Sequence, residues 1–174
     1  MGKNLYDIVS FDSYNSLCEA SVERDFDVFG IADEYNNKYE AIVLPDGLFV
    51  CGLMYYDSGI KPQIILQGNS SLLFLGFDKI VVCLNYLTKQ ILVEKEFLSL
   101  FYDFIDVKLY KLIIIVSELD VCAINYNGKM VWSLGFKDVV EDFHLYNNNK
   151  LFVKCADGNE SVLSITDGSF EIKD

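Results

Sequence analysis

The stretch VCAINYNGKMVWSL, residues 121–134, has the pattern of a β-hairpin. Apolar residues fill both arms, and Asn127-Gly128 stands between them, where both residues can adopt the positive φ angles of a type I′ turn. Just before it, the run from Lys111 to Val116 is apolar and β-branched, which is typical of a strand buried on both faces. This part of the chain therefore indicates short strands joined by tight turns.

The same pattern recurs about every 40 residues. Asn85-Tyr86-Leu87-Thr88-Lys89 aligns with Asn125-Tyr126-Asn127-Gly128-Lys129, and further turns of the same chemistry are expected at Asp46-Gly47, Asp157-Gly158 and Asp167-Gly168. The period predicts one all-β domain over residues 1–174. Its antiparallel four-stranded repeats are expected at roughly 27–63, 64–102, 103–141 and 142–174.

At most one short helix is expected, near the N-terminus, at Ser13 to Glu23. Ser16 is its candidate cap, with Glu19 three residues further on. The alternating segment Leu5 to Phe11 is expected to be a strand that completes the last repeat. The apolar runs predicted to form the core are Ile64–Leu66, Leu72–Leu75, Ile80–Leu84 and Leu112–Val116.

In length, strand order and hairpin position, the repeats resemble the blades of WD40-like or quinoprotein-like β-propellers over roughly residues 27–174. The Trp-Asp dipeptide of WD40 blades is absent, since the single tryptophan, Trp132, is followed by Ser133. The resemblance implies a small or partial β-propeller. A β-sandwich built from the same hairpins is the alternative.

Composition excludes several functional classes. The 174 residues are 52% hydrophobic, which is too apolar for a disordered chain. The net charge is −12, with 14 basic residues against 26 acidic ones, so binding to nucleic acid by neutralising phosphates is not expected. The sequence begins without an apolar leader, and the uncharged run Leu112–Val116 is too short to span a bilayer. We therefore expect a cytoplasmic protein with no membrane partner.

Signals for catalysis or metal binding are weak. The five cysteines are 32 to 39 residues apart, which favours buried, reduced thiols over a zinc site or redox pair. The single histidine, His144, is interpreted as a structural residue on a strand, and Asp157 to Ser161 as a hairpin turn rather than a calcium loop. No catalytic residue, metal or cofactor is predicted, and a carboxylate-based hydrolase is the less favoured alternative to a non-enzyme.

The distribution of charge is more informative. Residues 1–40 contain nine acids and only three bases, with aromatic residues among them. One interpretation is a solvated acidic surface that aids solubility. The other is a binding surface for a basic protein, because tyrosine supplies contact area and carboxylates steer a cationic partner. The predicted contact residues are Asp25, Asp27, Asp33, Glu34, Tyr35, Tyr55, Tyr56 and Asp57.

In size, acidity and lack of catalytic motifs, the sequence resembles the immunity proteins of bacterial contact-dependent growth inhibition systems. That resemblance implies an inhibitor that binds a basic toxin, such as a ribonuclease or other nuclease, in a one-to-one complex. It would cover the toxin's cationic active site with an acidic surface. The alternative is a propeller-like scaffold for protein interactions in a larger assembly.

Overall fold

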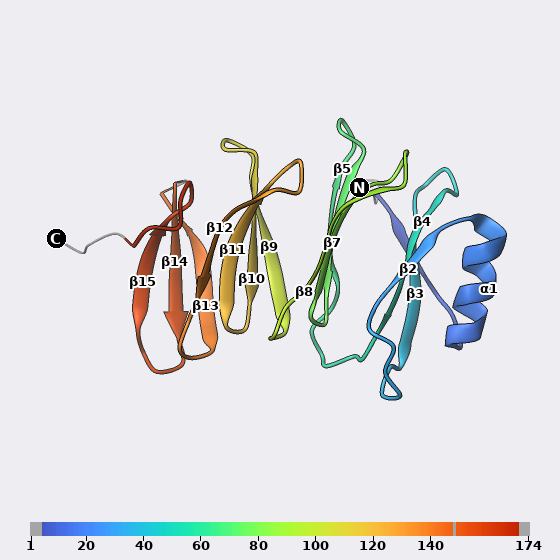
Figure 1. Ribbon diagram of the computed structural model, residues 1–174, viewed down its shortest axis with the longest axis horizontal. Helices are drawn as coiled ribbons and strands as arrows, with labels where there is room; N and C mark the ends of the chain where they lie inside the picture. Colours follow the sequence, from blue (N-terminus) through green and yellow to red (C-terminus); the bar gives the residue numbers. More distant parts are fainter. Residues whose placement is uncertain (1–4, 148, 171–174) are drawn as a thin grey trace. The chain divides into compact units, whose positions relative to one another are not determined.

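The computed structural model describes residues 5–147 and 149–170, which form fifteen strands and one helix (Figure 1). The prediction of an all-β fold with one short helix is confirmed. The predictions that reach Met1–Asn4 and Glu171–Asp174, on the N-terminal leader and the end of the last repeat, lie outside the described residues. The chain divides into two compact units, residues 1–61 with 86–89 and residues 62–85 with 90–174. The single domain stays a prediction.

The first unit contains one four-stranded sheet in the order β1-β3-β4-β2. The strand bounds are Asp7–Ser10 for β1, Asp27–Phe29 for β2, Lys38–Val43 for β3 and Phe49–Tyr55 for β4. β2 runs parallel to β4, and the other pairs are antiparallel. The helix α1, Tyr14–Arg24, covers one face of this sheet (Figure 1). Its Leu17 and Ala20 pack with Phe26 and Ala41 in a small core, which holds the helix on the sheet.

The predicted helix is present, but its cap is Ser13 rather than Ser16. The Ser13 hydroxyl accepts a hydrogen bond from the backbone N–H of Ser16 at 3.2 Å, so Ser16 lies inside the first turn. The helix ends at Asp25, which adopts the left-handed conformation and donates its N–H to the Ser21 carbonyl. The helix therefore begins and ends within one residue of the predicted range.

The prediction that the N-terminal strand completes the last repeat is wrong. β1 pairs with β3 of its own unit, with Ile8 opposite Ile42, and the pairing is extended by a 2.7 Å hydrogen bond from the Phe11 N–H to the Tyr39 carbonyl. Beside the last strand, Leu163 is instead bridged by Phe170, only seven positions along the chain. The strand β1 and the residue Leu163 therefore each pair with a segment of their own unit.

The second unit contains three antiparallel meanders in chain order. The first is β5 to β8, with bounds Gln63–Gln67, Leu72–Phe77, Ile80–Asn85 and Gln90–Glu96. The second is β9 to β12, with bounds Phe101–Val107, Leu112–Ser117, Asp120–Asn125 and Met130–Gly135. The third has three strands, β13 to β15, with bounds Val140–Tyr146, Lys150–Cys155 and Glu160–Ser164. The first two sheets are the four-stranded blade-like repeats that the sequence predicts, and the third has three strands within the described residues.

The surroundings of β10 explain why its sequence is apolar without interruption from Leu112 to Val116. Ile113 and Ile115 pack into a core with residues of the β5–β8 sheet, such as Phe74. Ile114 on the opposite face packs into a second core with Leu151 and other residues of the β13–β15 sheet. Both faces of the strand are therefore covered, so the usual alternation of polar and apolar residues disappears.

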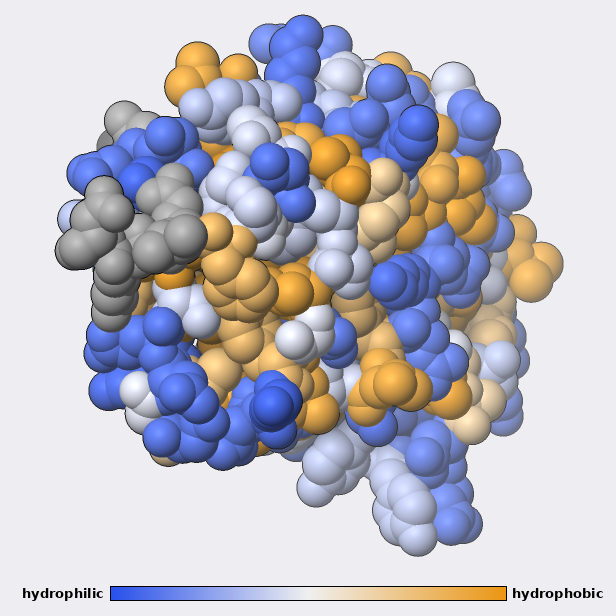
Figure 2. All heavy atoms as spheres, turned by 60° about the vertical axis from the view of Figure 1, so that its left-hand side comes forward, coloured by the Kyte–Doolittle hydropathy of each residue, from blue (hydrophilic) through white to orange (hydrophobic). Residues whose placement is uncertain are grey.

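The core predictions hold for three of the four apolar runs. Leu72–Leu75, Ile80–Leu84 and Leu112–Val116 are buried, whereas Ile64–Leu66 is only half-buried. The difference arises because β5 is an edge strand of its sheet. In Figure 2, in which the β13–β15 sheet comes forward, hydrophobic residues reach the surface in small areas separated by hydrophilic ones.

The turn at Asn127-Gly128 is present, but it is not of type I′. Gly128 has a φ of +77°, whereas Asn127 is not among the residues with positive φ. The Gly128 N–H donates to the Asn125 carbonyl and the Asn125 N–H to the Lys129 carbonyl, both at 2.9 Å. This pattern is a turn followed by a glycine bulge, which requires a positive φ at one residue only. Asp46-Gly47 and Asp157-Gly158 close their hairpins in the same way.

Candidate functional site

Five of the eight predicted contact residues lie on two neighbouring loops of the first unit. Loop 30–37 follows β2 and loop 56–59 follows β4, and these two strands run parallel, so both loops leave the same end of the sheet. Asp33, Glu34 and Tyr35 lie on the first loop, and Tyr56 and Asp57 on the second. We call these five residues the acidic–aromatic surface.

Hydrogen bonds join the two loops. The Asn37 N–H donates to the Tyr55 carbonyl at 3.2 Å, and the Asp57 N–H donates to the side-chain carbonyl of Asn37 at 2.9 Å. Lys38 lies 3.7 Å from the Asp57 carboxylate. These contacts hold the loops beside each other, so the surface is formed before any partner arrives.

The rings of Tyr35 and Tyr56 are exposed by 68% and 51%, which is unusual for large aromatic side chains. The acids Asp33, Glu34 and Asp57 are exposed as well. Aromatic contact area and negative charge are thus presented together. An arrangement of this kind is suited to binding a protein with cationic groups.

Gly30 determines how loop 30–37 begins. Its φ is +142°, and a Cβ at this position would lie 2.1 Å from the Met54 carbonyl oxygen. Only glycine allows the chain to pass this close to β4. Our sequence analysis did not single out Gly30, because nothing local distinguishes it from other glycines that follow a strand.

Tyr55 is wrongly placed among the contact residues. Its side chain is 5% exposed, and its hydroxyl donates to the Glu40 carboxylate at 2.9 Å. Burial and this hydrogen bond raise the pKa of Tyr55. The end of β4 explains the error, because the strand is buried as far as its last residue, Tyr55, and Tyr56 is the first residue of the exposed loop.

Asp25 and Asp27 lie apart from the acidic–aromatic surface. Asp25 caps α1 and receives a hydrogen bond from the Lys89 ammonium group of the same unit, and Asp27 begins β2. Loop 30–37 leaves the other end of that strand. The eight predicted contact residues therefore divide into three groups. Five form the acidic–aromatic surface, Asp25 and Asp27 lie at the opposite end of β2, and Tyr55 is buried.

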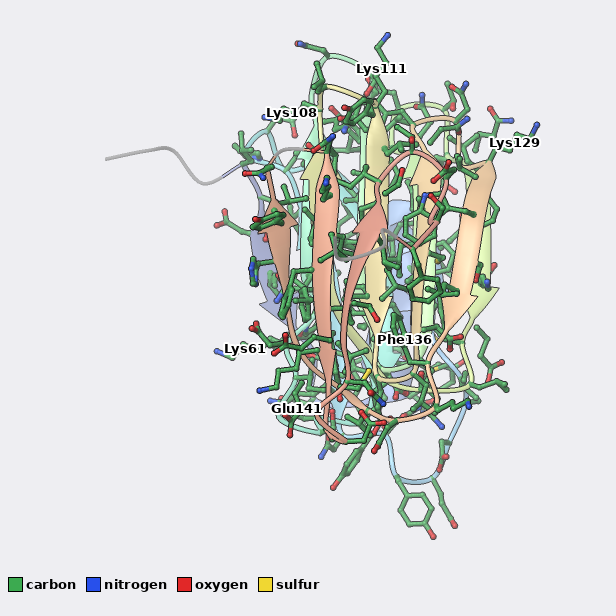
Figure 3. All side chains as sticks on the ribbon, turned by 90° about the vertical axis from the view of Figure 1, so that its left-hand side faces the viewer. Lys61, Lys108, Lys111, Lys129, Phe136 and Glu141 are labelled. Atoms are coloured by element: carbon green, nitrogen blue, oxygen red, sulfur yellow. The ribbon has the colours of Figure 1, made fainter. Side chains whose placement is uncertain are left out.

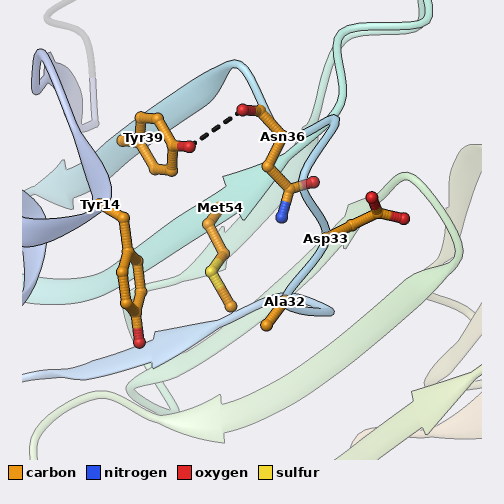
Figure 4. Close-up of a pocket in the computed structure, with 6 residues that line it drawn as sticks. All are labelled: Tyr14, Ala32, Asp33, Asn36, Tyr39 and Met54. Carbon is orange, nitrogen blue, oxygen red and sulfur yellow. Dashed lines mark hydrogen bonds between the residues drawn. The ribbon is translucent and has the colours of Figure 1, made fainter.

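A pocket of about 130 Å³ adjoins the surface (Figure 4). It is lined by Tyr14, Ala32, Asp33, Asn36, Tyr39 and Met54. The rings of Tyr14 and Tyr39 have centroids 6.5 Å apart, and the Tyr39 hydroxyl donates to the Asn36 backbone carbonyl at 2.9 Å. Our sequence analysis missed Tyr14 and Met54. The only available signal was an aromatic residue at the first turn of the predicted helix.

The second unit has a different charge pattern. Lys108, Lys111 and Lys129 are exposed in the β9–β10 and β11–β12 turns, and lie at the end opposite Phe136 and Glu141 (Figure 3). Exposed positive groups therefore occur among the turns at one end of this unit, although the net charge of the chain is −12. A negative surface is a property of particular loops rather than of the whole chain.

The cysteines and the histidine have ordinary surroundings. Cys51, Cys83, Cys122 and Cys155 are buried and Cys18 is partly buried, all as free thiols. Burial raises the pKa of Cys83 to about 12 and that of Cys122 to about 11, which disfavours reactive thiolates. His144 is exposed on β13, stacks on Phe152 with ring centroids 4.7 Å apart, and has its Nδ1 3.8 Å from Asp142.

Two further observations concern ligands and membranes. Asp157 lies in the β14–β15 turn, where it accepts a hydrogen bond from the Asn159 N–H at 2.9 Å, so this segment is the predicted hairpin turn. Among residues 5–147 and 149–170, no group of three or more metal-ligating side chains comes together. In the same part of the chain, α1 falls short of the length and apolarity that a membrane-spanning helix needs.

The sequence matches no model of a protein family, and no curated protein matches it. Solved structures do resemble its fold. The WD40 β-propeller domain of Doa1 is 10% identical with a TM-score of 0.51, and the match covers 81% of this chain and 50% of that chain. Sqt1 of Saccharomyces cerevisiae is 14% identical with a TM-score of 0.51, and the match covers 78% of this chain and 42% of that one.

These likenesses define the class of fold: the chain is built from antiparallel blades of the β-propeller type. This confirms the propeller-like resemblance of the repeats. The chain spans half or less of the length of these two solved chains. The resemblance to immunity proteins stays a prediction.

Proposed function

We propose that the protein is a protein-interaction module whose acidic–aromatic surface binds a basic protein. The observation that carries the proposal is the exposure of Tyr35 and Tyr56 on two loops that are hydrogen-bonded to each other. Exposed tyrosines lose little conformational entropy on binding and supply both apolar area and a hydroxyl group. A partner that covers them therefore gains contact energy at low entropic cost.

Charge determines the kind of partner. Three carboxylates, those of Asp33, Glu34 and Asp57, accompany the tyrosines, and the nearby cation Lys38 is already paired with Asp57. The net charge of −12 adds a long-range field of the same sign. Such a field accelerates the encounter with a cationic protein and disfavours an anionic one.

The fold is compatible with a binding role for these loops. Loops held at the end of a packed sheet are favourable binding elements, because the sheet fixes their position while their sequence is free to vary. Both loops of the surface leave the same end of the first-unit sheet. A scaffold role in a larger assembly would use the same surface.

Neutralisation of a basic toxin is a narrower form of the proposal. A nuclease binds the phosphates of its substrate through cationic groups, and carboxylates can occupy these groups in place of phosphates. The supporting feature is the acidic–aromatic surface itself. If the partner is a nuclease, one molar equivalent of this protein should abolish its activity, whereas a scaffold would leave the activity intact.

The proposal is tested by affinity capture from the source cells at low and moderate salt, with mass spectrometry of the bound proteins. We expect a basic protein in one-to-one amounts that is retained at moderate salt. The combined variant Asp33→Asn, Glu34→Gln and Asp57→Asn should capture about tenfold less of it.

The control removes the same number of charges elsewhere. Glu23, Glu94 and Glu141 are exposed acids outside the surface, and their combined substitution by glutamine should leave capture unchanged. Equal losses in both triple variants would show that only the net charge matters. Retention of no basic protein by the wild-type chain would contradict the proposal outright.

A further inference from the structure

The pocket beside the acidic–aromatic surface has the size of a single side chain. Its volume of about 130 Å³ is well below the roughly 300–1,000 Å³ of pockets that hold metabolites or cofactors. Pockets that receive one anchoring side chain are typical of the energetic centre of protein interfaces. The volume therefore fits one side chain of a protein better than a whole metabolite or cofactor.

The interior of the pocket is apolar and aromatic. Met54 lies between Tyr14 and the residues of loop 30–37, with Ala32 at one side (Figure 4). Met54 is only 9% exposed, and it is one of the residues that line the pocket. An occupant needs an aliphatic or aromatic part to fill this space.

Two polar groups of the pocket lining donate hydrogen bonds within loop 30–37 and to its residues, and a third, Asp33, is an acceptor. The Asn36 side-chain NH₂ donates to the Ile31 carbonyl at 2.7 Å, and the Tyr39 hydroxyl donates to the Asn36 carbonyl. Asp33 accepts the Tyr35 N–H through Oδ1 at 3.0 Å. The Asp33 side chain lies at the edge of the pocket, and its carboxylate points outward, away from Met54 and Tyr14 (Figure 4). An occupant with a donor at its outer end therefore meets an acceptor where it leaves the pocket.

We propose that this pocket binds one lysine or arginine side chain of the basic partner, an inference that rests on the function proposed above. The aliphatic stem packs on Met54 and on the rings of Tyr14 and Tyr39. The cationic head leaves the pocket beside Asp33 and donates to its outward-pointing carboxylate. Glu34 and Asp57 on the adjoining surface add attraction of the same sign.

Methionine methyl NMR tests the inference with a probe inside the pocket. The chain has three methionines, so a spectrum of ¹³C-methyl-methionine protein is simple to read. Met54 reports on the pocket, and Met130, 36% exposed on β12, is the internal control. N-acetyl-arginine amide and N-acetyl-lysine amide should shift the Met54 signal saturably and leave the Met130 signal unchanged.

Two controls isolate the role of charge. N-acetyl-norleucine amide has the stem without the cation and should bind about tenfold more weakly than the lysine probe. Asp33→Asn should weaken the cationic probes by a similar factor. Asp46→Asn should not, although Asp46 accepts a hydrogen bond from the Leu48 N–H through the same kind of turn at 3.1 Å.

Equal binding of norleucine and lysine probes, or an unchanged affinity in Asp33→Asn, would overturn the cationic assignment. Together with the capture experiment, these NMR results distinguish failure of the pocket assignment from failure of the proposed function. If a basic protein is captured in a charge-dependent way while Met54 does not respond, the pocket assignment alone is wrong. If Met54 responds while no basic protein is captured, the pocket binds cations and the proposed function is wrong.

Discussion

The side-chain carbonyl of Asn37 accepts a hydrogen bond from the backbone N–H of Asp57, 20 positions further along the chain, at 2.9 Å. The backbone N–H of Asn37 donates in turn to the Tyr55 carbonyl at 3.2 Å. The last residue of loop 30–37 thus fixes the loop that follows β4. The tyrosines and carboxylates of the acidic–aromatic surface are positioned through this contact.

Asn37→Ala should release loop 56–59 without unfolding the sheet. The Asp57 amide proton then loses its acceptor, and its hydrogen exchange should accelerate about fivefold, which corresponds to about 1 kcal/mol. Asn37→Asp keeps an acceptor oxygen and should preserve the protection. Unaltered exchange at Asp57 in the alanine variant would show that this contact does not hold the loop.

A single cysteine should react in the folded protein. Cys18 is only partly buried, whereas Cys51, Cys83, Cys122 and Cys155 are buried. Ellman's reagent at pH 8 should titrate about one thiol in native protein and all five after denaturation. Cys18→Ser should abolish the native reaction, and rapid labelling of two or more thiols would contradict the burial of the other four.

The turn at Gly168 should be less tolerant of substitution than the turn at Gly158. Both glycines have positive φ, +71° and +85°. A Cβ at Gly168 would lie 2.7 Å from the Trp132 ring, whereas a Cβ at Gly158 would meet nothing within 4 Å. Trp132 is also held by a hydrogen bond from its Nε1 to the Ile165 carbonyl at 2.7 Å, so its ring has little freedom to move away.

Gly158→Ala should lower the free energy of unfolding by about 1 kcal/mol, through backbone strain alone. Gly168→Ala should lose about 1–3 kcal/mol more from the steric clash. Urea unfolding followed by the fluorescence of the single tryptophan, Trp132, measures both. Equal losses in the two variants would mean that the turn does not pack on Trp132.

Stability should fall as the pH rises above about 9. The pKa of the Cys122 thiol is raised from 9.0 to about 11, mainly by burial. The pKa of Tyr126 is raised from 10.0 to about 12, by burial and by its 2.6 Å hydrogen bond to Asp106. The folded state binds these protons more tightly than the unfolded state, so their contribution is complete below pH 9 and lost as the pH passes through 11 to 12.

Urea midpoints measured between pH 8 and pH 11 check this sign. We expect a steady decrease that becomes smaller in Cys122→Ala, which removes one titrating group from the core. Tyr126→Phe should lower stability at pH 8 by about 1–2 kcal/mol, through loss of the bond to Asp106, and flatten the decrease above pH 10. A midpoint that rises with pH would contradict the assignment.

The blades could be predicted because their signals are local. The hairpin at residues 121–134 and the run at Leu112–Val116 specify strands through turn chemistry and apolar continuity, and the period of about 40 residues repeats them. The pairing of β1 with β3 carries no such signal. An alternating segment can join any open sheet edge, so its partner depends on the tertiary structure.

The position of the acidic–aromatic surface could be predicted in outline but not in detail. Acidic residues near aromatic ones identified the loops that carry Tyr35 and Tyr56, but the exposure of each residue depends on where the buried strand β4 ends. Tyr55 and Tyr56 are adjacent, yet one is 5% and the other 51% exposed. The pocket joins Tyr14 of α1 to Met54 of β4, and no pattern in the sequence relates these two positions.

The central claim, that the acidic–aromatic surface binds a basic protein, is tested most directly by affinity measurements with that purified partner. Tyr35→Ala and Tyr56→Ala should each weaken binding about tenfold or more, since both rings lie within the proposed interface. Tyr146→Ala, which removes a ring 49% exposed on β13 of the second unit, should leave the affinity unchanged. Unchanged affinity in the first two variants, or an equal loss in all three, would contradict the account.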